Sequence, residues 1–209
     1  GSGKTPLTLW IAAALRARGL HPGIVSRGYG GTERGPAAVP RGGDYRRYGD
    51  EPVLMAEAGA SPVWIARRRA DAARALLAAH PECDAILCDD GLQHYALARD
   101  VEIAVVDARG HGNGFMLPAG PLREPAARPV DATVGHGARG DYSMRLVPAG
   151  FTRVTDRAPA SPAALAGRRL HAVAAIGHPQ RFFDTLASLG LAFTPHPFPD
   201  HHAYTAADL

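Results

Sequence analysis

The sequence predicts an α/β fold: a mostly parallel sheet with flanking helices, followed by a smaller C-terminal α/β unit. Apolar, β-branched runs alternate with segments of helical periodicity, which is typical of parallel strands joined by crossover helices. The 209 residues are 46% hydrophobic, enough for one full core with a smaller appendage. A glycine-rich segment at the start leads directly into the first helical pattern, as a phosphate-binding loop does.

The first helix is expected at residues 5–18, with Pro6 tolerated in its first turn and Gly19 ending it. Residues spaced three and four apart predict its apolar face: Leu7, Trp10, Ile11, Ala14 and Leu15. Further helices are expected at 51–58, 69–80 and 180–189. Strands are expected at 23–26, 63–66, 85–88, 102–106, 132–134 and 171–176.

Two long segments, 27–49 and 110–129, are rich in glycine with arginine or proline and show no period, so we expect functional loops there. A Pro/Ala-rich stretch at 157–167 predicts a linker between a nucleotide-binding domain at 1–156 and a smaller unit that starts at 168–209. Residues 204–209 have the pattern of a first helical turn with Thr205 as N-cap. Because the chain begins inside a phosphate loop and stops after this turn, we expect an internal fragment.

Composition excludes several classes of protein. The formal net charge is only +3, which argues against a dedicated nucleic-acid binder. No stretch reaches the roughly 18 apolar residues of a membrane span, and no signal peptide is visible. Cys83 and Cys88 form no CxxC pair and are expected to be buried, reduced thiols of a cytosolic protein.

The opening segment predicts a P-loop and hence a P-loop NTPase-like sheet. Its backbone N–H groups and the following helix dipole would surround phosphate oxygens. Lys4 would reach the outer phosphates and the Thr5 hydroxyl would bind Mg²⁺. Lys4 is the only lysine among 23 basic residues, and it stands where the mechanism needs a compact point charge. The expected nucleotide-binding residues are Gly1, Ser2, Gly3, Lys4, Thr5 and Pro6.

A P-loop needs a second anchor for the metal. Residues 85–88 are apolar and Asp89 and Asp90 follow, which places both carboxylates at the carboxyl edge of a strand. Without the P-loop, a strand that ends in a polar turn at Asp90-Gly91 would be the simpler interpretation. Because the P-loop is present, we favour a magnesium role for either Asp89 or Asp90. Asp107 follows another apolar run and is a weaker rival.

Other polar groups are ambiguous from spacing alone. Asp50 and Glu51 open a helix, where acids often serve only as caps. Asp200-His201-His202 suggests metal ligation, an Asp–His pair for proton transfer, or a plain surface pair. Residues 67–69, all arginine, are most simply a solvated helix start. A single lysine leaves no Asn/Thr-Lys-x-Asp segment for guanine, which favours ATP over GTP.

Seven segments in order resemble the tetraacyldisaccharide 4'-kinase family of lipid A biosynthesis. They are GSGKTP (1–6), SRGYGG (26–31), GDEP (49–52), DDGLQH (89–94), LPAGPLREP (117–125), AIGHP (175–179) and FPDHHAY (198–204). The resemblance covers nearly the whole chain, and SRGYGG, DDGLQH and GPLREP are far more distinctive than the P-loop. It implies transfer of the ATP γ-phosphate to the 4'-hydroxyl of lipid A disaccharide 1-phosphate, with Mg²⁺, at the cytoplasmic face of the Gram-negative inner membrane. Family members anchor there through an N-terminal helix that is not in this sequence.

The resemblance also implies roles for single residues. Asp50 matches the catalytic base, paired with a histidine of the DHH segment, for which we favour His201. Lys4 and Asp89 act at the transferred phosphate. Thr5, Asp89, Asp90 and Glu124 would hold the metal, Arg123 would neutralise phosphate charge, and Gln93 and His94 would border the nucleotide or sugar.

A rival from another class stays open at this point. A nucleotide-dependent switch or metallochaperone ATPase would use the same loop, hydrolyse ATP without a lipid acceptor, and load metal through His201 and His202. A small-molecule P-loop kinase or synthetase is a second alternative, although the long Gly/Pro-rich loops suit a bulky acceptor better.

Overall fold

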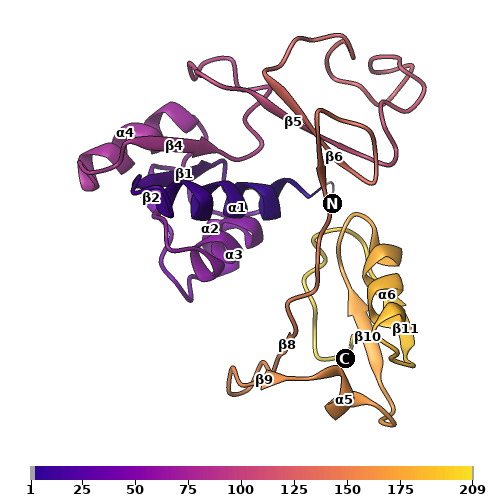
Figure 1. Ribbon diagram of the computed structural model, residues 1–209. Helices are drawn as coiled ribbons and strands as arrows, with labels where there is room; N and C mark the ends of the chain where they lie inside the picture. Colours follow the sequence, from indigo (N-terminus) through magenta and orange to yellow (C-terminus); the bar gives the residue numbers. More distant parts are fainter. Residues whose placement is uncertain (1–2, 209) are drawn as a thin grey trace. The chain divides into compact units, whose positions relative to one another are not determined.

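The computed structural model describes residues 3–208, and the chain divides into two compact units between Arg145 and Leu146. The first unit contains a four-stranded sheet in the order β2-β3-β1-β4 (Figure 1). The central strand β1 (Pro22–Ser26) runs parallel to β3 (Val63–Ile65) and to β4 (Ala85–Cys88). The short β2 (Ala37–Ala38) is antiparallel to β3.

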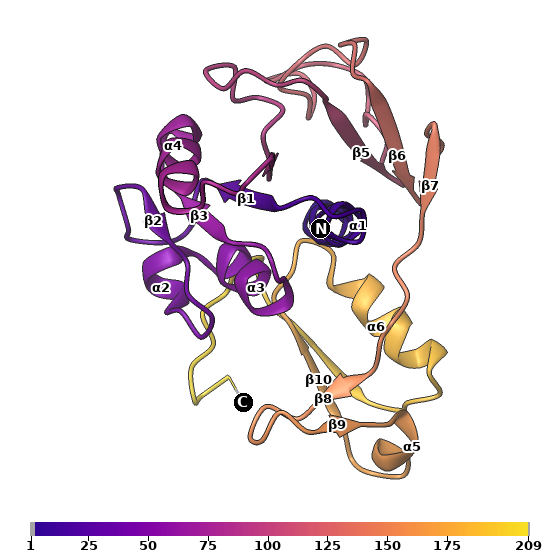
Figure 2. The same ribbon diagram turned by 60° about the vertical axis from the view of Figure 1, so that its left-hand side comes forward.

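Helices pack on both faces of this sheet. As a result β1 is buried along its whole length, with side chains that point alternately to one face and the other. Ile24 belongs to the core beneath α1 (Lys4–Arg16) and α3 (Asp50–Ala58), with Met55 fully buried there. Val25 faces the other way, into the core beneath α4 (Arg69–Ala79), with Leu76. Figure 2 shows α3 and α4 with the sheet strands between them.

The predicted apolar face of α1 is wrong in part, because Leu7, Ile11, Ala14 and Leu15 are half-buried but Trp10 is not. Trp10 is 68% exposed, whereas Ala12 is buried and Leu9 packs against the core beside it. The sequence was ambiguous because apolar residues surround this helix on all sides. A threonine, a leucine and an alanine at positions 5, 9 and 12 share the face that meets the sheet, and the small side chains allow close approach.

The first unit also contains a parallel sheet of three strands: β5 (Ile103–Asp107), β6 (Ala132–His136) and β7 (Tyr142–Met144). Residues 108–131 connect β5 to β6 without a helix, visible as an irregular ribbon in Figure 1. This agrees with the predicted loop at 110–129. The predicted loop at 27–49 is wrong in part, because it contains β2 and the one-turn helix α2 (Tyr45–Tyr48). Elements of two and four residues are too short to leave a period in the sequence.

The second unit is built on two parallel strands, β10 (His171–Ala174) and β11 (Thr194–Pro197), joined by helix α6 (Pro179–Ser188). Ala172 and Ala174 alternate inward and pack against Phe183 and Leu186 of the helix. The hairpin strands β8 (Phe151–Thr152) and β9 (Pro159–Ala160) precede the short helix α5 (Pro162–Leu165).

The predicted mixed α/β class with parallel sheets is confirmed, and every predicted strand and helix up to residue 189 is present within a few residues of its expected ends. The first helical turn expected from Tyr204 is only a turn at residues 205–208, with Leu209 outside the described residues. There the Thr205 amide and hydroxyl both donate to the Asp208 carboxylate, at 2.7 Å each. Within residues 3–208, no helix is long and apolar enough to cross a membrane.

Gly49, between α2 and α3, should tolerate no side chain. Its φ is +90°, and an added Cβ would collide with the Tyr29 carbonyl oxygen, which is backbone and cannot turn away. Gly49→Ala is therefore expected to lower the free energy of unfolding by about 1–3 kcal/mol, measured by urea denaturation. Gly19→Ala is the matched control, because Gly19 has φ +85° with open space around it. Equal losses in the two variants would contradict the importance of the Tyr29 contact.

Candidate active site

The polar groups predicted at the carboxyl edge of the four-stranded sheet do meet there. Asp89 and Asp90 directly follow β4, and the N-terminus of α1 lies beside them: Lys4 Nζ forms an ion pair with Asp90 Oδ1. Asp90 has φ 53°, a left-handed conformation that an Asp adopts more readily than most residues. The Arg69 guanidinium donates to the Asp90 carbonyl oxygen at 3.1 Å, and this bond holds the turn.

Two longer contacts connect α1 to the acids around it. The Thr5 hydroxyl lies 3.4 Å from Glu51 Oε1, and the Thr8 hydroxyl lies 3.5 Å from Asp89 Oδ1. Both distances are at the limit of a hydrogen bond, so these hydroxyls are only loosely held. We call Glu51, Asp89 and Asp90 the carboxylate cluster. It joins the first turn of α3 to the end of β4 beside the first turn of α1.

Asp89 is the most perturbed group of this cluster. It is 3% exposed, and its pKa is raised from the usual 3.8 to about 6, mainly by burial. The neighbouring Glu51 and Asp90 carboxylates contribute to this rise, whereas Lys4 and Arg69 oppose it. A buried carboxylate near other acids, balanced incompletely by two cations, is a site where an added positive charge would be favourable.

Asp50 is the first residue of α3, and its Oδ1 accepts a hydrogen bond from the Glu51 amide at 2.9 Å. His201 belongs to the second unit, where its φ is 58° and its Nε2 lies 3.9 Å from Asp200 Oδ2. Its neighbour His202 stacks on Phe198 and lies 3.2 Å from Asp208 Oδ2. The pairing of Asp50 with His201 stays a prediction.

Gln93 and His94 lie in the turn after the carboxylate cluster. Gln93 is exposed, while His94 is half-buried and its Nε2 has no hydrogen-bond partner in the described structure. Burial lowers the pKa of His94, and the positive charges of Arg69 and Arg99 lower it further, which favours the neutral imidazole. Arg99 holds this turn by donating from Nη1 to the carbonyl oxygens of Gly91 at 2.8 Å and of Leu92 at 3.2 Å.

Glu124 and Arg123 lie on the long connection between β5 and β6. Arg123 is exposed, whereas the Glu124 side chain is 15% exposed and its Oε2 lies 2.9 Å from Arg128 Nε. Glu124 Oε1 is buried without a hydrogen-bond partner. Between residues 3 and 208, no hydrogen bond or ion pair joins Glu124 to the carboxylate cluster.

Arg128 connects Glu124 to a second acid. Its Nη2 donates to both oxygens of Glu102, at 2.7 and 2.8 Å, and Arg99 Nη2 reaches Glu102 at 2.6 Å. All four side chains are at most 20% exposed. This chain of alternating charges connects the turn that carries His94 to the segment that carries Glu124.

Glu102→Gln tests this network. The change leaves Arg99 and Arg128 without their shared carboxylate in a largely buried place, so we expect a loss of about 1–3 kcal/mol in the free energy of unfolding. Glu33→Gln is the matched control, because Glu33 also accepts two guanidinium bonds, but from Arg47, which is 58% exposed. The control should lose clearly less stability, because water screens the charge of the exposed Arg47. Similar urea midpoints for both variants would contradict a special role for Glu102.

One interpretation of the sequence needs correction. Arg69 is not solvated, since it is 8% exposed and bound to the Asp90 carbonyl. Asp107, the weaker metal candidate, is 6% exposed and paired with the Arg109 guanidinium at 2.6 Å, and its role stays a prediction. Gly1 and Ser2 of the predicted loop lie outside the described residues. Gly3 is described, with φ +97° just before α1, and Pro6 is exposed in the first turn.

Sequence reasoning gave Glu51 only a capping role and missed its place in the carboxylate cluster. The available signal was its position in GDEP, next to the predicted base. Arg99 was missed entirely, because no spacing rule relates an arginine to carbonyl oxygens five to eight residues before it.

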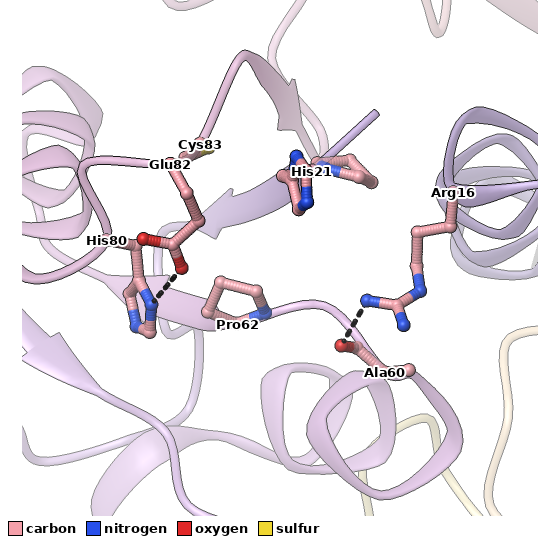
Figure 3. A pocket seen from close by; sticks show the side chains of 8 residues that line it. Arg16, His21, Ala60, Pro62, His80, Glu82 and Cys83 are labelled. Carbon is pink, nitrogen blue, oxygen red and sulfur yellow. Dashed lines mark hydrogen bonds and ion pairs between the residues drawn. The ribbon is translucent and has the colours of Figure 1, made fainter. Parts of the chain in front are cut away.

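A separate cavity of about 220 Å³ lies at the opposite edge of the sheet (Figure 3). It opens where β1, β3 and β4 begin, since Pro22 starts β1 and Pro62 precedes β3. Its polar groups are already engaged with one another: His80 Nδ1 lies 3.2 Å from Glu82 Oε1, and Arg16 donates to the Ala60 carbonyl at 3.0 Å. Ligands of parallel sheets bind at the carboxyl edge, so this cavity is not the candidate site.

Comparisons with known proteins point to one family. A family model described as tetraacyldisaccharide-1-P 4'-kinase (LpxK) matches residues 1–209. A protein of Azoarcus sp. (strain BH72) named tetraacyldisaccharide 4'-kinase is 55% identical over all of this chain and 65% of its own length. One of the same name from Aromatoleum aromaticum is 53% identical over all of this chain and 66% of its own length. The chain thus spans slightly less than two thirds of these relatives.

A solved structure is also similar: the crystal structure of "apo" form LpxK from Aquifex aeolicus in complex with ATP. The TM-score is 0.72 at 27% identity, with 97% of this chain and 68% of that chain covered.

Proposed function

We propose that this chain, which belongs to the tetraacyldisaccharide-1-P 4'-kinase family, carries the phosphate-transfer site of an ATP-dependent lipid A kinase. The reaction moves the γ-phosphate of ATP to the 4'-hydroxyl of lipid A disaccharide 1-phosphate, at the cytoplasmic face of the inner membrane. The observation that carries the proposal is the meeting of Lys4, Thr5 and the carboxylate cluster at the carboxyl edge of the sheet.

Nucleotide binding follows from the start of α1. The helix begins at Lys4, so its free N–H groups and dipole favour a phosphate at this end. Lys4 pairs with Asp90 in the structure and can exchange that partner for the more highly charged phosphate. Similarity to the protein whose crystal structure contains ATP supports ATP as the nucleotide.

The residues present also fit Mg²⁺. The described residues contain no group of three or more His, Cys, Asp or Glu side chains that could hold a metal by themselves. Mg²⁺, however, commonly takes one or two carboxylates and completes its shell with waters and substrate phosphates. Asp89, with Asp90 and the Thr5 hydroxyl, would supply these oxygen ligands, and the unpartnered Glu124 Oε1 is a further candidate. When bound, Mg²⁺ would neutralise charge on the transferred phosphate.

Asp50 is proposed as the base for the acceptor hydroxyl. It stands at the first turn of α3, next to Glu51 of the carboxylate cluster, so a hydroxyl within its reach would be close to the phosphate. A carboxylate at hydrogen-bond distance can take the hydroxyl proton as the new P–O bond forms. His201 would orient Asp50, while Arg123 would balance phosphate charge and Gln93 and His94 would border the bound substrates.

The test is transfer of labelled γ-phosphate from ATP to lipid A disaccharide 1-phosphate, followed by separation of the lipid product. We expect labelled lipid with the wild type and a large loss with Lys4→Ala, which removes the charge at the outer phosphates. Label that appears only as inorganic phosphate, at the same rate with and without acceptor, would contradict the proposal.

A further inference from the structure

The two parallel strands of the second unit bring together two histidines that have no part in the proposed function. His171 is the first residue of β10, and His196 lies in β11. His171 Nδ1 lies 2.9 Å from His196 Nε2, and the rings stack with their centroids 5.1 Å apart and their planes at 29°. Imidazole nitrogens are the commonest protein ligands of transition metals, so the pair presents two such ligands side by side.

The sheet places both histidines on one face. Ala172 and Ala174 of β10 are buried against α6, so His171 points to the opposite face. In the parallel register, His196 is paired with Val173, which shares the face of His171. His171 is exposed and His196 is half-buried, so a cation can reach them from solvent. The spacing of the two rings is therefore set by the backbone pairing of β10 with β11.

The contact between the rings favours the form that binds a metal. One nitrogen must carry a proton and the other must accept it through a lone pair, so at least one of the two imidazoles is neutral. A further proton at this contact would bring two positive charges together. Other histidines lie against carboxylates, which favour the charged imidazolium instead: His21, His80, His201 and His202.

The distance between the two nitrogens suits a metal whose ligands meet at right angles. With metal–nitrogen bonds of about 2.0–2.1 Å, a right angle at the metal places the nitrogens about 2.9 Å apart, whereas a tetrahedral angle needs about 3.3 Å. Right-angled ligands are typical of the square-planar and tetragonal sites of Cu²⁺ and Ni²⁺. The described residues contain no metal-holding group of three or more His, Cys, Asp or Glu side chains, so waters would complete the shell.

We propose that His171 and His196 together bind a divalent transition-metal ion of the Cu²⁺ or Ni²⁺ type. The ion takes the place of the shared proton, which is released to solvent. Because the ion joins β10 to β11, it stabilises the second unit. The same strands support the segment that follows them, since the Phe198 amide donates to the Ala174 carbonyl at 2.8 Å. Binding needs neither nucleotide nor lipid, so this inference does not depend on the proposed function.

Calorimetric titration of the 209-residue chain with Ni²⁺ tests the site without ATP or acceptor. We expect a binding step that is lost in both His171→Ala and His196→Ala, because each variant keeps only one of the two ligands. His178→Ala is the matched control, since His178 is an exposed histidine of the same unit, just before α6, and its loss should leave the step unchanged. A step that either His171→Ala or His196→Ala retains would overturn the proposal, as would the absence of any step in the wild type.

Electron paramagnetic resonance with Cu²⁺ identifies the ligands. The wild type should show hyperfine coupling to two nitrogens, and each of the two single variants to one at most. Affinity should also fall from about pH 7.5 to about pH 5, where protons compete with the metal for imidazole nitrogens. Circular dichroism checks that the variants are folded. Two-nitrogen coupling that persists in His196→Ala, or equal wild-type affinity at the two pH values, would overturn the proposal, because the ligands would then be other groups.

Discussion

Replacing Asp50 with alanine is expected to lower kcat by about 10²–10⁴-fold while leaving ATP binding nearly unchanged. A sugar hydroxyl is a poor nucleophile, and the rate of transfer depends on a base that takes its proton as the P–O bond forms. Asp50 lies at the start of α3, beside the Glu51 that contacts Thr5, whereas Lys4 at the nucleotide end of α1 pairs with Asp90. Loss of the Asp50 carboxylate should therefore slow the chemical step more than it weakens nucleotide binding.

A second variant and a control separate the role of Asp50 as a base from its structural role at the start of α3. Asp50→Asn can still accept the Glu51 amide hydrogen bond but cannot take a proton, so it should be as slow as the alanine variant. Asp44→Ala removes another N-terminal carboxylate, one that accepts the Arg46 amide at 2.9 Å before α2, and should keep nearly the wild-type rate. Wild-type kcat in Asp50→Asn would remove Asp50 as the base.

Asp89→Asn is expected to abolish most phosphate transfer and yet to stabilise the metal-free fold above pH 6. The pKa of Asp89 is raised to about 6, mainly by burial, so the folded protein holds a proton there that the unfolded chain has already lost. The wild-type free energy of unfolding therefore falls as the pH rises from about 4 to 6 and stays low above it. Two pKa units correspond to about 3 kcal/mol, an upper bound on the gain from asparagine.

Urea denaturation at about pH 4 and about pH 8, without divalent cations, measures this difference. The wild type and Asp89→Asn should have nearly equal free energies of unfolding at about pH 4, and the variant should be more stable at about pH 8. Added Mg²⁺ and nucleotide should stabilise the wild type more than the variant, because the ligand binds the ionised carboxylate. A variant less stable than the wild type above pH 6 would show that the ionised Asp89 is favourable in the fold, contrary to the raised pKa.

The sequence was most informative where chemistry follows directly from chain order. Four apolar residues before Asp89 and Asp90 predicted a buried strand with its acids at the carboxyl edge, and β4 has these bounds. The glycine before Lys4 predicted the start of α1. Both features depend on neighbours in sequence, and the Lys4–Asp90 pair follows from the fold that they define.

Features that depend on packing between distant segments were not predictable. Arg69 was assigned to solvent because three arginines in a row normally face water, yet the last one is buried against the Asp90 carbonyl. Glu102 and Arg128 are 26 residues apart, and neither belongs to a motif that would connect them. The face of α1 that meets the sheet was hidden because its apolar residues are spread around the helix.

The most direct test of the account compares ATP consumption with phosphate transferred to lipid. The wild-type protein is given ATP and Mg²⁺, first alone and then with lipid A disaccharide 1-phosphate, and ³¹P NMR locates any new phosphate on the sugar. We expect little ATP loss without acceptor, and with it one phosphate at the 4' position for each ATP consumed. Steady ATP hydrolysis that ignores the acceptor, with no new sugar phosphate, would contradict the account and favour a nucleotide-driven switch.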